Sequence, residues 1–196
     1  MSGQLPRSLF GRLIRWLIGS STLLLIAALT YSATIRLAPS ALMFAVTHRL
    51  ASLGGVNQIV HAPRADEHQR SVVMPSPDFL YSYCVYDLSH GALRVQASVP
   101  ADTYWSVSAY DAHTDNYYAI DDRSLPAHRL DLLLIAAQSP LPSPASSGST
   151  ADFVVRSPST RGILLFRTLV DRDARVTELD QARRQASCQS ENESSS

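Results

Sequence analysis

An uncharged apolar run near the N-terminus constrains the fold of this chain more than any other feature. Residues Trp16–Ile35 contain no charged side chain and no proline. A helix needs about 20 mainly apolar residues to cross the hydrocarbon core of a bilayer, and this run has that length. The sequence therefore predicts a membrane anchor within residues 1–38, with the lipid bilayer as the partner of this run.

The arginines on either side of the run predict its orientation. Arg7, Arg12 and Arg15 precede it, whereas only Arg36 follows it closely. Because positive residues favour the cytoplasmic side of a membrane, we expect the N-terminus in the cytoplasm and the rest of the chain on the far side. The expected location is the bacterial inner membrane, crossed once, with the C-terminal domain in the periplasm.

A cleaved signal peptide is the alternative interpretation of the same run. Signal peptidases need small residues just before the cut, and a cut after Ala33 would place bulky Tyr31 at one of these positions. The sequence therefore favours an anchor that stays attached over a signal peptide that is removed.

The composition excludes several kinds of chemistry. All 17 basic residues are arginine, because the chain contains no lysine. This excludes a P-loop lysine, a Schiff base and a lysine general base. The 17 acidic residues bring the net charge to zero, so no overall field attracts nucleic acid. We expect no nucleic-acid partner and no cofactor.

Cys84 and Cys188 are the two cysteines of the chain. In an oxidising periplasm such a pair is expected to form a disulfide, whereas two unrelated thiols are the alternative. We predict a bridge that joins the first core strand to the end of the C-terminal helix.

From Asp78 onward the apolar residues recur with a period of two, which is typical of β-strands. We expect residues 89–91 to form a tight hairpin turn between the first two strands. Short strands at regular spacing predict a mainly β domain over residues 78–188, of the sandwich or jelly-roll type. The expected strands are residues 79–88, 92–99, 103–110, 116–120, 130–137, 151–157 and 161–170.

Helical patterns flank this domain. Pro39 stands where the first turn of a helix tolerates proline, and apolar residues at helical spacing follow it up to Gly54-Gly55. The sequence predicts a juxtamembrane helix and linker over residues 39–77. A second helix is expected over residues 173–186, followed by a disordered tail over residues 189–196.

Several motifs in the β region occur in an order that resembles the domain of unknown function 1254 family. The motifs are Pro77-Asp78 with Leu80-Tyr81-Ser82, then Asp111-Ala112 with Thr114-Asp115-Asn116, and finally Arg167-Thr168-Leu169-Val170-Asp171. The resemblance covers about half of the chain. It implies a domain of the β-sandwich type located in the cell envelope.

The segment Arg36–Pro39, which directly follows the apolar run, is similar to that of a short, membrane-anchored branch of the family. Larger relatives carry a companion β domain, so the resemblance implies an envelope protein with that domain as a partner. It implies no established reaction and no cofactor.

The segment Asp111–Asn116 holds the densest group of potential metal ligands. A calcium-binding loop needs oxygen ligands at its early odd positions and glycine at its sixth, whereas His113 and Asn116 stand at two of these positions. A single histidine with aspartates is weak support for a transition-metal site. We therefore predict no metal site and a hairpin turn in which Asp and Asn side chains bind the local backbone.

The polar motif residues are the candidates for binding a ligand or partner. Arg161 and Arg167 lie on an apolar strand, so we expect each to pair with a carboxylate, for which Asp78 and Asp111 are the candidates. The candidate binding residues are Asp78, Tyr81, Asp111, Asp115, Asn116 and Arg161.

Two functions from different classes fit this pattern. The favoured one is non-catalytic binding of an envelope partner or ligand, with no catalytic residue assigned. The alternative is a periplasmic, hydrolase-like enzyme that uses a cluster of Asp78, Asp111 and Asp115. The alternative requires the fold to bring these three carboxylates together.

Overall fold

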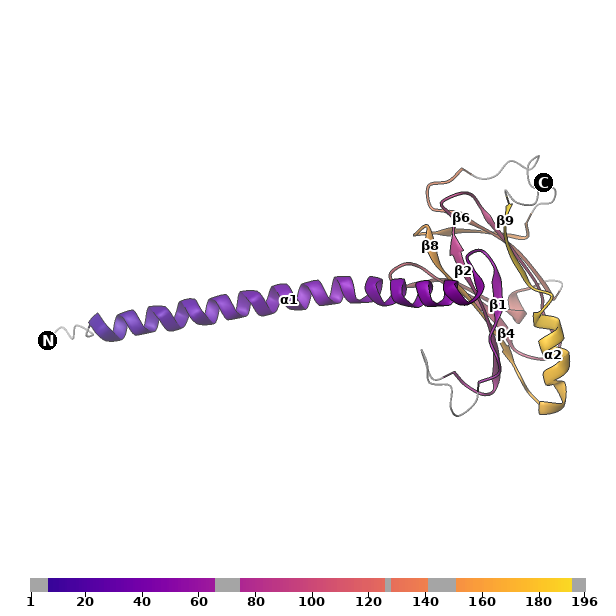
Figure 1. Ribbon diagram of the computed structural model, residues 1–196, viewed down its shortest axis with the longest axis horizontal. Helices are drawn as coiled ribbons and strands as arrows, with labels where there is room; N and C mark the ends of the chain where they lie inside the picture. Colours follow the sequence, from indigo (N-terminus) through magenta and orange to yellow (C-terminus); the bar gives the residue numbers. More distant parts are fainter. Residues whose placement is uncertain (1–6, 66–74, 126–127, 141–150, 192–196) are drawn as a thin grey trace. The chain divides into compact units, whose positions relative to one another are not determined.

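A computed structural model describes residues 7–65, 75–125, 128–140 and 151–191 (Figure 1). The chain divides into two compact units, one over Met1–Ala41 and one over Leu42–Ser196. Helix α1 (Arg7–Gly54) supplies the described part of the first unit and the first residues of the second.

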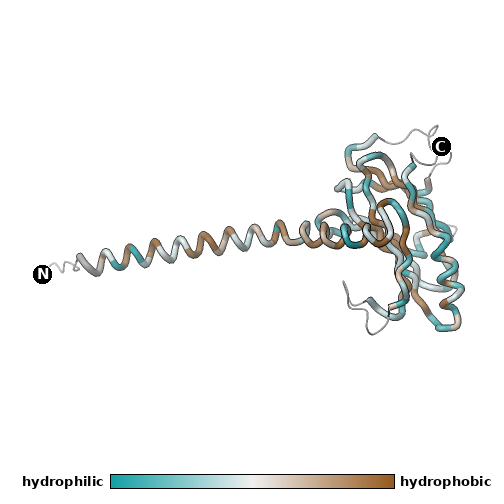
Figure 2. The backbone as a smooth tube through the Cα atoms, in the orientation of Figure 1, coloured by the Kyte–Doolittle hydropathy of each residue, from teal (hydrophilic) through white to brown (hydrophobic). Residues whose placement is uncertain are grey.

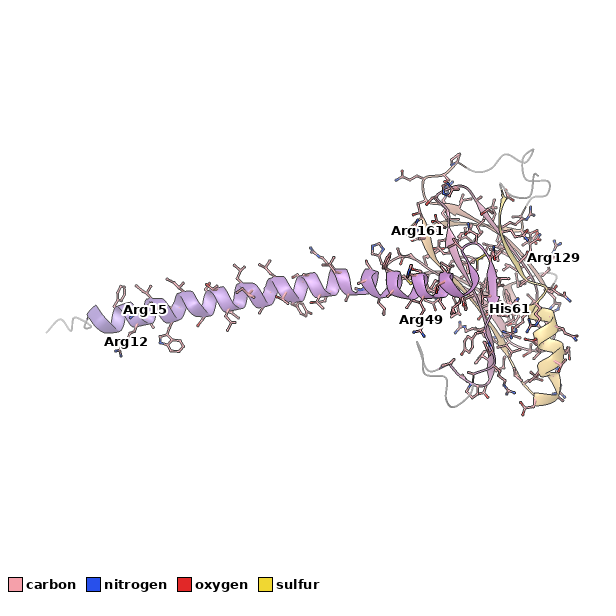
Figure 3. All side chains as sticks on the ribbon, in the orientation of Figure 1. Arg12, Arg15, Arg49, His61, Arg129 and Arg161 are labelled. Atoms are coloured by element: carbon pink, nitrogen blue, oxygen red, sulfur yellow. A yellow bond between two sulfur atoms is a disulfide. The ribbon has the colours of Figure 1, made fainter. Side chains whose placement is uncertain are left out.

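The first unit exposes apolar side chains along α1. Trp16, Leu24 and Tyr31 are 76%, 70% and 69% exposed. Hydrophobic stretches recur along the helix, with less hydrophobic residues between them (Figure 2). Arg12 and Arg15 lie near the start of the helix (Figure 3). Within the described residues, Phe10–Gly54 is the one helical stretch long and apolar enough to cross a membrane, by length and composition.

The structure differs from the sequence prediction at Pro39. The sequence predicted two helices, the second beginning at Pro39, but α1 continues through this residue. A proline inside a helix removes one backbone hydrogen bond and crowds the preceding turn. The apolar residues on both sides keep the helical period, so one local loss does not end the helix.

The second unit contains two β-sheets packed together. In the larger sheet the strand order is β1 (Ile59–His61), β2 (Phe79–Asp87), β8 (Arg161–Leu169), β4 (Trp105–Tyr110) and β5 (Asn116–Asp121). In the smaller sheet it is β7 (Phe153–Ser157), β6 (Arg129–Ala136), β3 (Leu93–Ser98) and β9 (Ser187–Ser190). Neighbouring strands are antiparallel except β6 and β7, which are parallel. The predicted mainly β domain is confirmed as two packed sheets.

The period of two in the sequence places one face of each strand in the core between the sheets. From β4, Trp105, Val107 and Ala109 are buried there, and they meet Val95 of β3 and Leu132 of β6 in one cluster. Because side chains alternate along a strand, Ser106 and Ser108 point to the opposite, outer face of the larger sheet. This outer face carries the candidate site.

The end of α1 covers one part of that outer face. Met43 is buried against Val85 of β2 and Ile163 of β8, and Val46 and Leu50 pack beside it. These contacts lie within the second unit, so the helical residues 42–54 pack as part of the β domain.

The predicted hairpin between the first two strands is wrong. β2 lies in the larger sheet and β3 in the smaller one, so residues 89–91 cross from sheet to sheet. An apolar period of two shows which face of a strand is buried but does not show which strand lies beside it.

The short elements near the ends also differ from the prediction. Strand β1 lies in the predicted linker and contains only three residues. The predicted C-terminal helix consists of a 3-10 turn, η2 (Asp173–Arg175), and α2 (Val176–Arg183). It is followed by β9, whose last residues were assigned to the tail. A second 3-10 turn, η1 (Asp122–Ser124), follows β5.

The predicted disulfide between Cys84 and Cys188 is confirmed. It connects β2 of the larger sheet to β9 of the smaller one, across a Cα–Cα distance of 6.6 Å. Both residues are at most 2% exposed. The bridge therefore holds the two sheets together, whereas the sequence analysis expected it to hold the C-terminal helix on one sheet.

Candidate ligand-binding site

The turn between β4 and β5 is organised by the buried carboxylate of Asp111. Its Oδ1 atom accepts hydrogen bonds from the backbone nitrogens of His113 (2.7 Å) and Asp115 (3.0 Å). The side-chain amide of Asn116, turned so that its nitrogen faces the acceptors around it, donates to the carbonyl oxygen of Tyr118 at 2.9 Å. The hairpin turn predicted from Asp111–Asn116 is present, with Asp111 as its main acceptor.

His113 does not have the surroundings of a metal ligand. Its side chain is 62% exposed, and its Nδ1 atom lies 3.5 Å from Oδ2 of Asp111. Among the described residues, no group of three or more His, Cys, Asp or Glu side chains could hold a metal ion.

We expect Asp111→Ala to destabilise the domain by about 2 to 4 kcal/mol, because it leaves two backbone N–H groups without their acceptor. His113→Ala is the matched control, and we expect it to stay within about 0.5 kcal/mol of the wild type, as exposed substitutions do. Urea denaturation of both variants measures the difference. An equal or larger loss in His113→Ala would contradict this account of the turn.

The six predicted binding residues do not converge on one site. Strand β2 spans about 26 Å at the usual rise per residue. Asp78 and Tyr81 lie at its first end, where both contact Ser76. The other four lie toward its second end: Asp111, Asp115, Asn116 and Arg161.

The predicted partners of Arg161 are wrong. Its Nε atom donates to Oδ2 of Asp87 at 2.7 Å, and the two residues are opposite each other on β8 and β2. Arg161 lies at the edge of the β domain (Figure 3). Asp78 and Asp111 stand at opposite ends of the sheet, so the carboxylate cluster required by the hydrolase alternative does not form.

A serine–histidine pair exists, but it is a packing contact. Nδ1 of His61 lies 2.8 Å from Oγ of Ser82, which is 2% exposed. Burial lowers the pKa of His61, and the nearby Arg183 and Arg184 lower it further. Asp180 is committed to these two arginines. The pair joins β1 to β2 and offers no accessible nucleophile.

The outer face of the larger sheet contains a pocket of about 190 Å³ that joins three strands. Ser106 of β4 stands at its centre, opposite Arg167 of β8 on one side and Asp121 of β5 on the other. Cross-strand partners point to the same face, so the three side chains form a row. The pocket lining is Tyr104, Ser106, Ser108, Ala119, Ile120, Asp121, Ser124 and Arg167.

Two buried polar atoms in this row lack a hydrogen-bond partner among the described residues. They are Oγ of Ser106 and Nε of Arg167. The residue Ser106 is only 3% exposed. Arg167 has one long contact, from Nη2 to Oγ of Ser108 at 3.5 Å. Buried polar groups are nearly always paired, so these two require an explanation.

Arg167 contrasts with the other arginines that lie partly inside the domain. Arg94 forms two hydrogen bonds with Asp131, each of 2.9 Å, and Arg183 binds Asp180 and two backbone carbonyl oxygens. In the part of the chain that the structure describes, no carboxylate lies within ion-pair distance of Arg167. The guanidinium of Arg167 therefore has no ion-pair partner among the described residues.

Asp121 lines the same pocket, but its carboxylate binds the nearby Ser124. Its Oδ1 atom accepts hydrogen bonds from the backbone nitrogen (3.2 Å) and the hydroxyl (2.9 Å) of Ser124. It caps the η1 turn and leaves the guanidinium of Arg167 free to bind another group.

A larger cleft of about 480 Å³ lies between the edge strands β1 and β9. One of its polar side chains, Asn57, donates to Oγ of Ser190 at 2.9 Å and to the carbonyl oxygen of Asp87 at 3.0 Å. Neither of the unpartnered buried atoms lies in this cleft. The smaller Arg167 pocket is therefore the better candidate for a ligand site.

The sequence analysis identified Arg167 but expected a carboxylate partner for it, which is wrong. It missed Ser106, Ser108 and Asp121. Within "TYWSVSAY" the serines alternate with apolar residues. This pattern was a signal that the outer face of this strand carries small hydroxyl groups.

The fold and the pocket define a class of protein: a domain of two packed β-sheets with a polar pocket on one outer face, preceded by a long apolar helix. Residues 56–190 match the family described as "Protein of unknown function (DUF1254)". The chain belongs to this family, and the resemblance found in its motifs is confirmed.

Two solved structures are similar to the chain. The crystal structure of the VPA0106 protein from Vibrio parahaemolyticus matches with a TM-score of 0.62 and 16% identity, over 81% of this chain and 36% of that one. An uncharacterized protein from Burkholderia cenocepacia matches with a TM-score of 0.42 and 16% identity, over 59% of this chain and 32% of that one. The first likeness supports the fold alone, and the chain spans about a third of the Vibrio protein. No curated protein matches the sequence.

Proposed function

We propose that this protein is a membrane-anchored domain in the bacterial periplasm that binds a small ligand. The exposed apolar face of α1 and the arginines before it support a single membrane crossing. The disulfide is consistent with a domain outside the cytoplasm, since such bridges persist in oxidising compartments. Within the family, we expect the chain to belong to the short, membrane-anchored branch.

The observation that carries the binding function is the pair of unpartnered buried atoms beside one pocket, Ser106 Oγ and Arg167 Nε. Leaving a buried donor or acceptor unpaired costs about 1 to 3 kcal/mol. A ligand that pairs with these atoms would recover this free energy on binding. Uncompensated groups of this kind occur where function takes precedence over stability.

The other functions predicted from the sequence have less support. The hydrolase alternative needs Asp78, Asp111 and Asp115 close together, but Asp78 lies at the opposite end of the larger sheet from the turn that holds Asp111 and Asp115. An envelope protein with a companion β domain stays a prediction from the family resemblance. The pocket favours a small ligand as the first candidate.

We expect the small-molecule fraction of a periplasmic extract to raise the melting temperature of the purified full-length protein in lipid nanodiscs. Ligand present at about 100 times its Kd stabilises a folded protein by about 2.7 kcal/mol, which corresponds to several degrees for a chain of this size. Arg167→Met should not respond to the extract.

The matched control is Arg123→Gln, which removes an exposed arginine on the neighbouring η1 turn. This variant should respond as the wild type does. An extract that leaves the wild type unchanged, or that stabilises Arg167→Met equally, would show that the pocket does not bind a ligand.

A further inference from the structure

We propose that the Arg167 pocket binds a small monocarboxylate, with the carboxylate held by Arg167 and Ser106. This inference rests on the proposed binding function and names the chemical class of its ligand. Four properties of the pocket lead to it: the free edge of the guanidinium, the buried hydroxyl beside it, the local charge, and the size of the pocket.

The free edge of Arg167 has the geometry that recognises a carboxylate. A guanidinium presents its N–H groups as a planar fork, and Nε with a neighbouring Nη can bind both carboxylate oxygens in parallel. Among the residues that the structure describes, Nε has no partner, and Nη2 has only the 3.5 Å contact to Ser108. Arg167 lies on β8 between Tyr81 of β2 and Ser106 of β4, so the sheet fixes the base of its side chain.

Ser106 supplies a further donor next to the same position. Its hydroxyl is buried, unpartnered and directly opposite Arg167 across the strand pair. A serine hydroxyl has one proton to donate, and a carboxylate accepts up to about four hydrogen bonds. One carboxylate therefore satisfies both unpartnered groups and also supplies the negative charge that the guanidinium lacks, which a neutral carbonyl group does not.

The local charge favours a monoanion over phosphate. The pocket contains one guanidinium, and the carboxylate of Asp121 stands on the other side of Ser106. Asp121 is committed to Ser124 and does not pair with Arg167, but its negative charge still opposes a highly charged anion. One carboxylate charge pairs with the single guanidinium, whereas a dianionic phosphate would add a second negative charge with no second cation among the lining residues to compensate it.

The pocket volume limits the rest of the ligand. About 190 Å³ corresponds to about six water molecules at the volume that each occupies in the liquid. Ala119 and the ring of Tyr104 provide apolar wall, and Tyr104 is held edge-on by Phe79 at a centroid distance of 6.2 Å. The part of the ligand inside the pocket is therefore short, and it contacts both this apolar wall and the hydroxyl groups of Ser108 and Ser124.

Isothermal titration of the full-length protein in nanodiscs with three probes tests this inference. Propionate should bind saturably, while its neutral isostere propionamide and inorganic phosphate should each bind at least about 10-fold more weakly, because hydrogen bonds to charged groups are the strong ones. Arg167→Met should weaken propionate binding by roughly 10- to 100-fold. Arg167→Lys keeps the positive charge but lacks the planar guanidinium, so its affinity for propionate should lie between those of the wild type and Arg167→Met.

Two further variants keep the test independent of folding defects. Ser106→Ala removes one hydroxyl from the outer face and should weaken propionate binding several-fold with an unchanged circular dichroism spectrum. Arg123→Gln, outside the pocket lining, should bind propionate as the wild type does. Arg167→Met should melt at or above the wild-type temperature, because it removes a desolvated charge that has no carboxylate partner.

The outcomes separate this inference from the proposed function. Tighter binding of phosphate, equal binding of propionamide, or propionate binding unaffected by Arg167→Met would overturn the carboxylate assignment. If the periplasmic extract still stabilises the wild type through Arg167 in that case, the pocket binds another class of ligand and the binding function stands. If neither response depends on Arg167, both proposals fail.

Discussion

Replacing both cysteines, in Cys84→Ala/Cys188→Ala, should lower the free energy of unfolding by about 4 to 5 kcal/mol. The bridge closes a loop with a sequence separation of 104 residues, and the chain-entropy account assigns about 4.7 kcal/mol to a loop of this length. In the folded protein the bridge links β2 of the larger sheet to β9 of the smaller one, so its loss also removes a covalent link between the two sheets.

Guanidinium denaturation of the wild type, the reduced wild type and the double variant measures this loss. The reduced wild type should match the double variant, since both lack the covalent link. A double variant as stable as the oxidised protein would contradict the structural role of the bridge. Two free thiols in protein taken directly from the membrane would contradict both the bridge and the proposed location of the domain outside the cytoplasm.

The second large effect is expected at Asp131, on the outer face of the smaller sheet. This residue is 4% exposed and accepts two hydrogen bonds from Arg94 and one from Gln96. Removing one partner of a buried pair costs about 3 to 5 kcal/mol. Arg94 keeps a longer contact to Glu191, 3.6 Å from its Nη1 atom, so Asp131→Ala should lose about 3 kcal/mol, at the lower end of that range. Asp173→Ala breaks an exposed pair with Arg64 and should lose at most about 1 kcal/mol.

The same pair predicts a pH dependence with a defined sign. Burial opposes ionisation of Asp131, but the hydrogen bonds and charge of Arg94 outweigh it and hold the pKa of the carboxyl below its usual value of 3.8. Its stabilising contribution is therefore full above pH 3.8 and is lost as the pH falls through the lower folded-state pKa. Asp131→Ala should lack this part of the acid sensitivity. Equal acid sensitivity in the variant and the wild type would contradict this assignment.

The sequence predicted the strands of the domain better than their arrangement. The alternation around Leu93, Val95 and Ala97 identified β3 because burial of one face leaves a period of two in the sequence. The same alternation does not specify the neighbour of a strand, which is why β2 and β3 were placed in one hairpin although they lie in different sheets. Strands as short as β1 contain too few residues to show any period.

The candidate site depends on contacts that are distant in the sequence. Ser106 and Asp121 come together through the β4–β5 hairpin, which the sequence predicted. Arg167 reaches them only because β8 inserts between β2 and β4. The sequence indicated that an arginine on an apolar strand needs a partner, but the missing partner became evident only from the three-dimensional arrangement.

The central claim is that Arg167 binds the ligand in the pocket. Its most direct test is to follow the nuclear magnetic resonance signal of the Arg167 Nε–H group during a titration. The chain contains 17 arginines, so its spectrum contains many Nε–H signals. The signal of Arg167 is identified as the one that is missing from the spectrum of Arg167→Lys. Titration of the full-length protein with propionate should move this one signal saturably, while the Arg123 signal stays in place. An Arg167 signal that does not move, or a uniform and unsaturated shift of all arginine signals, would contradict the account.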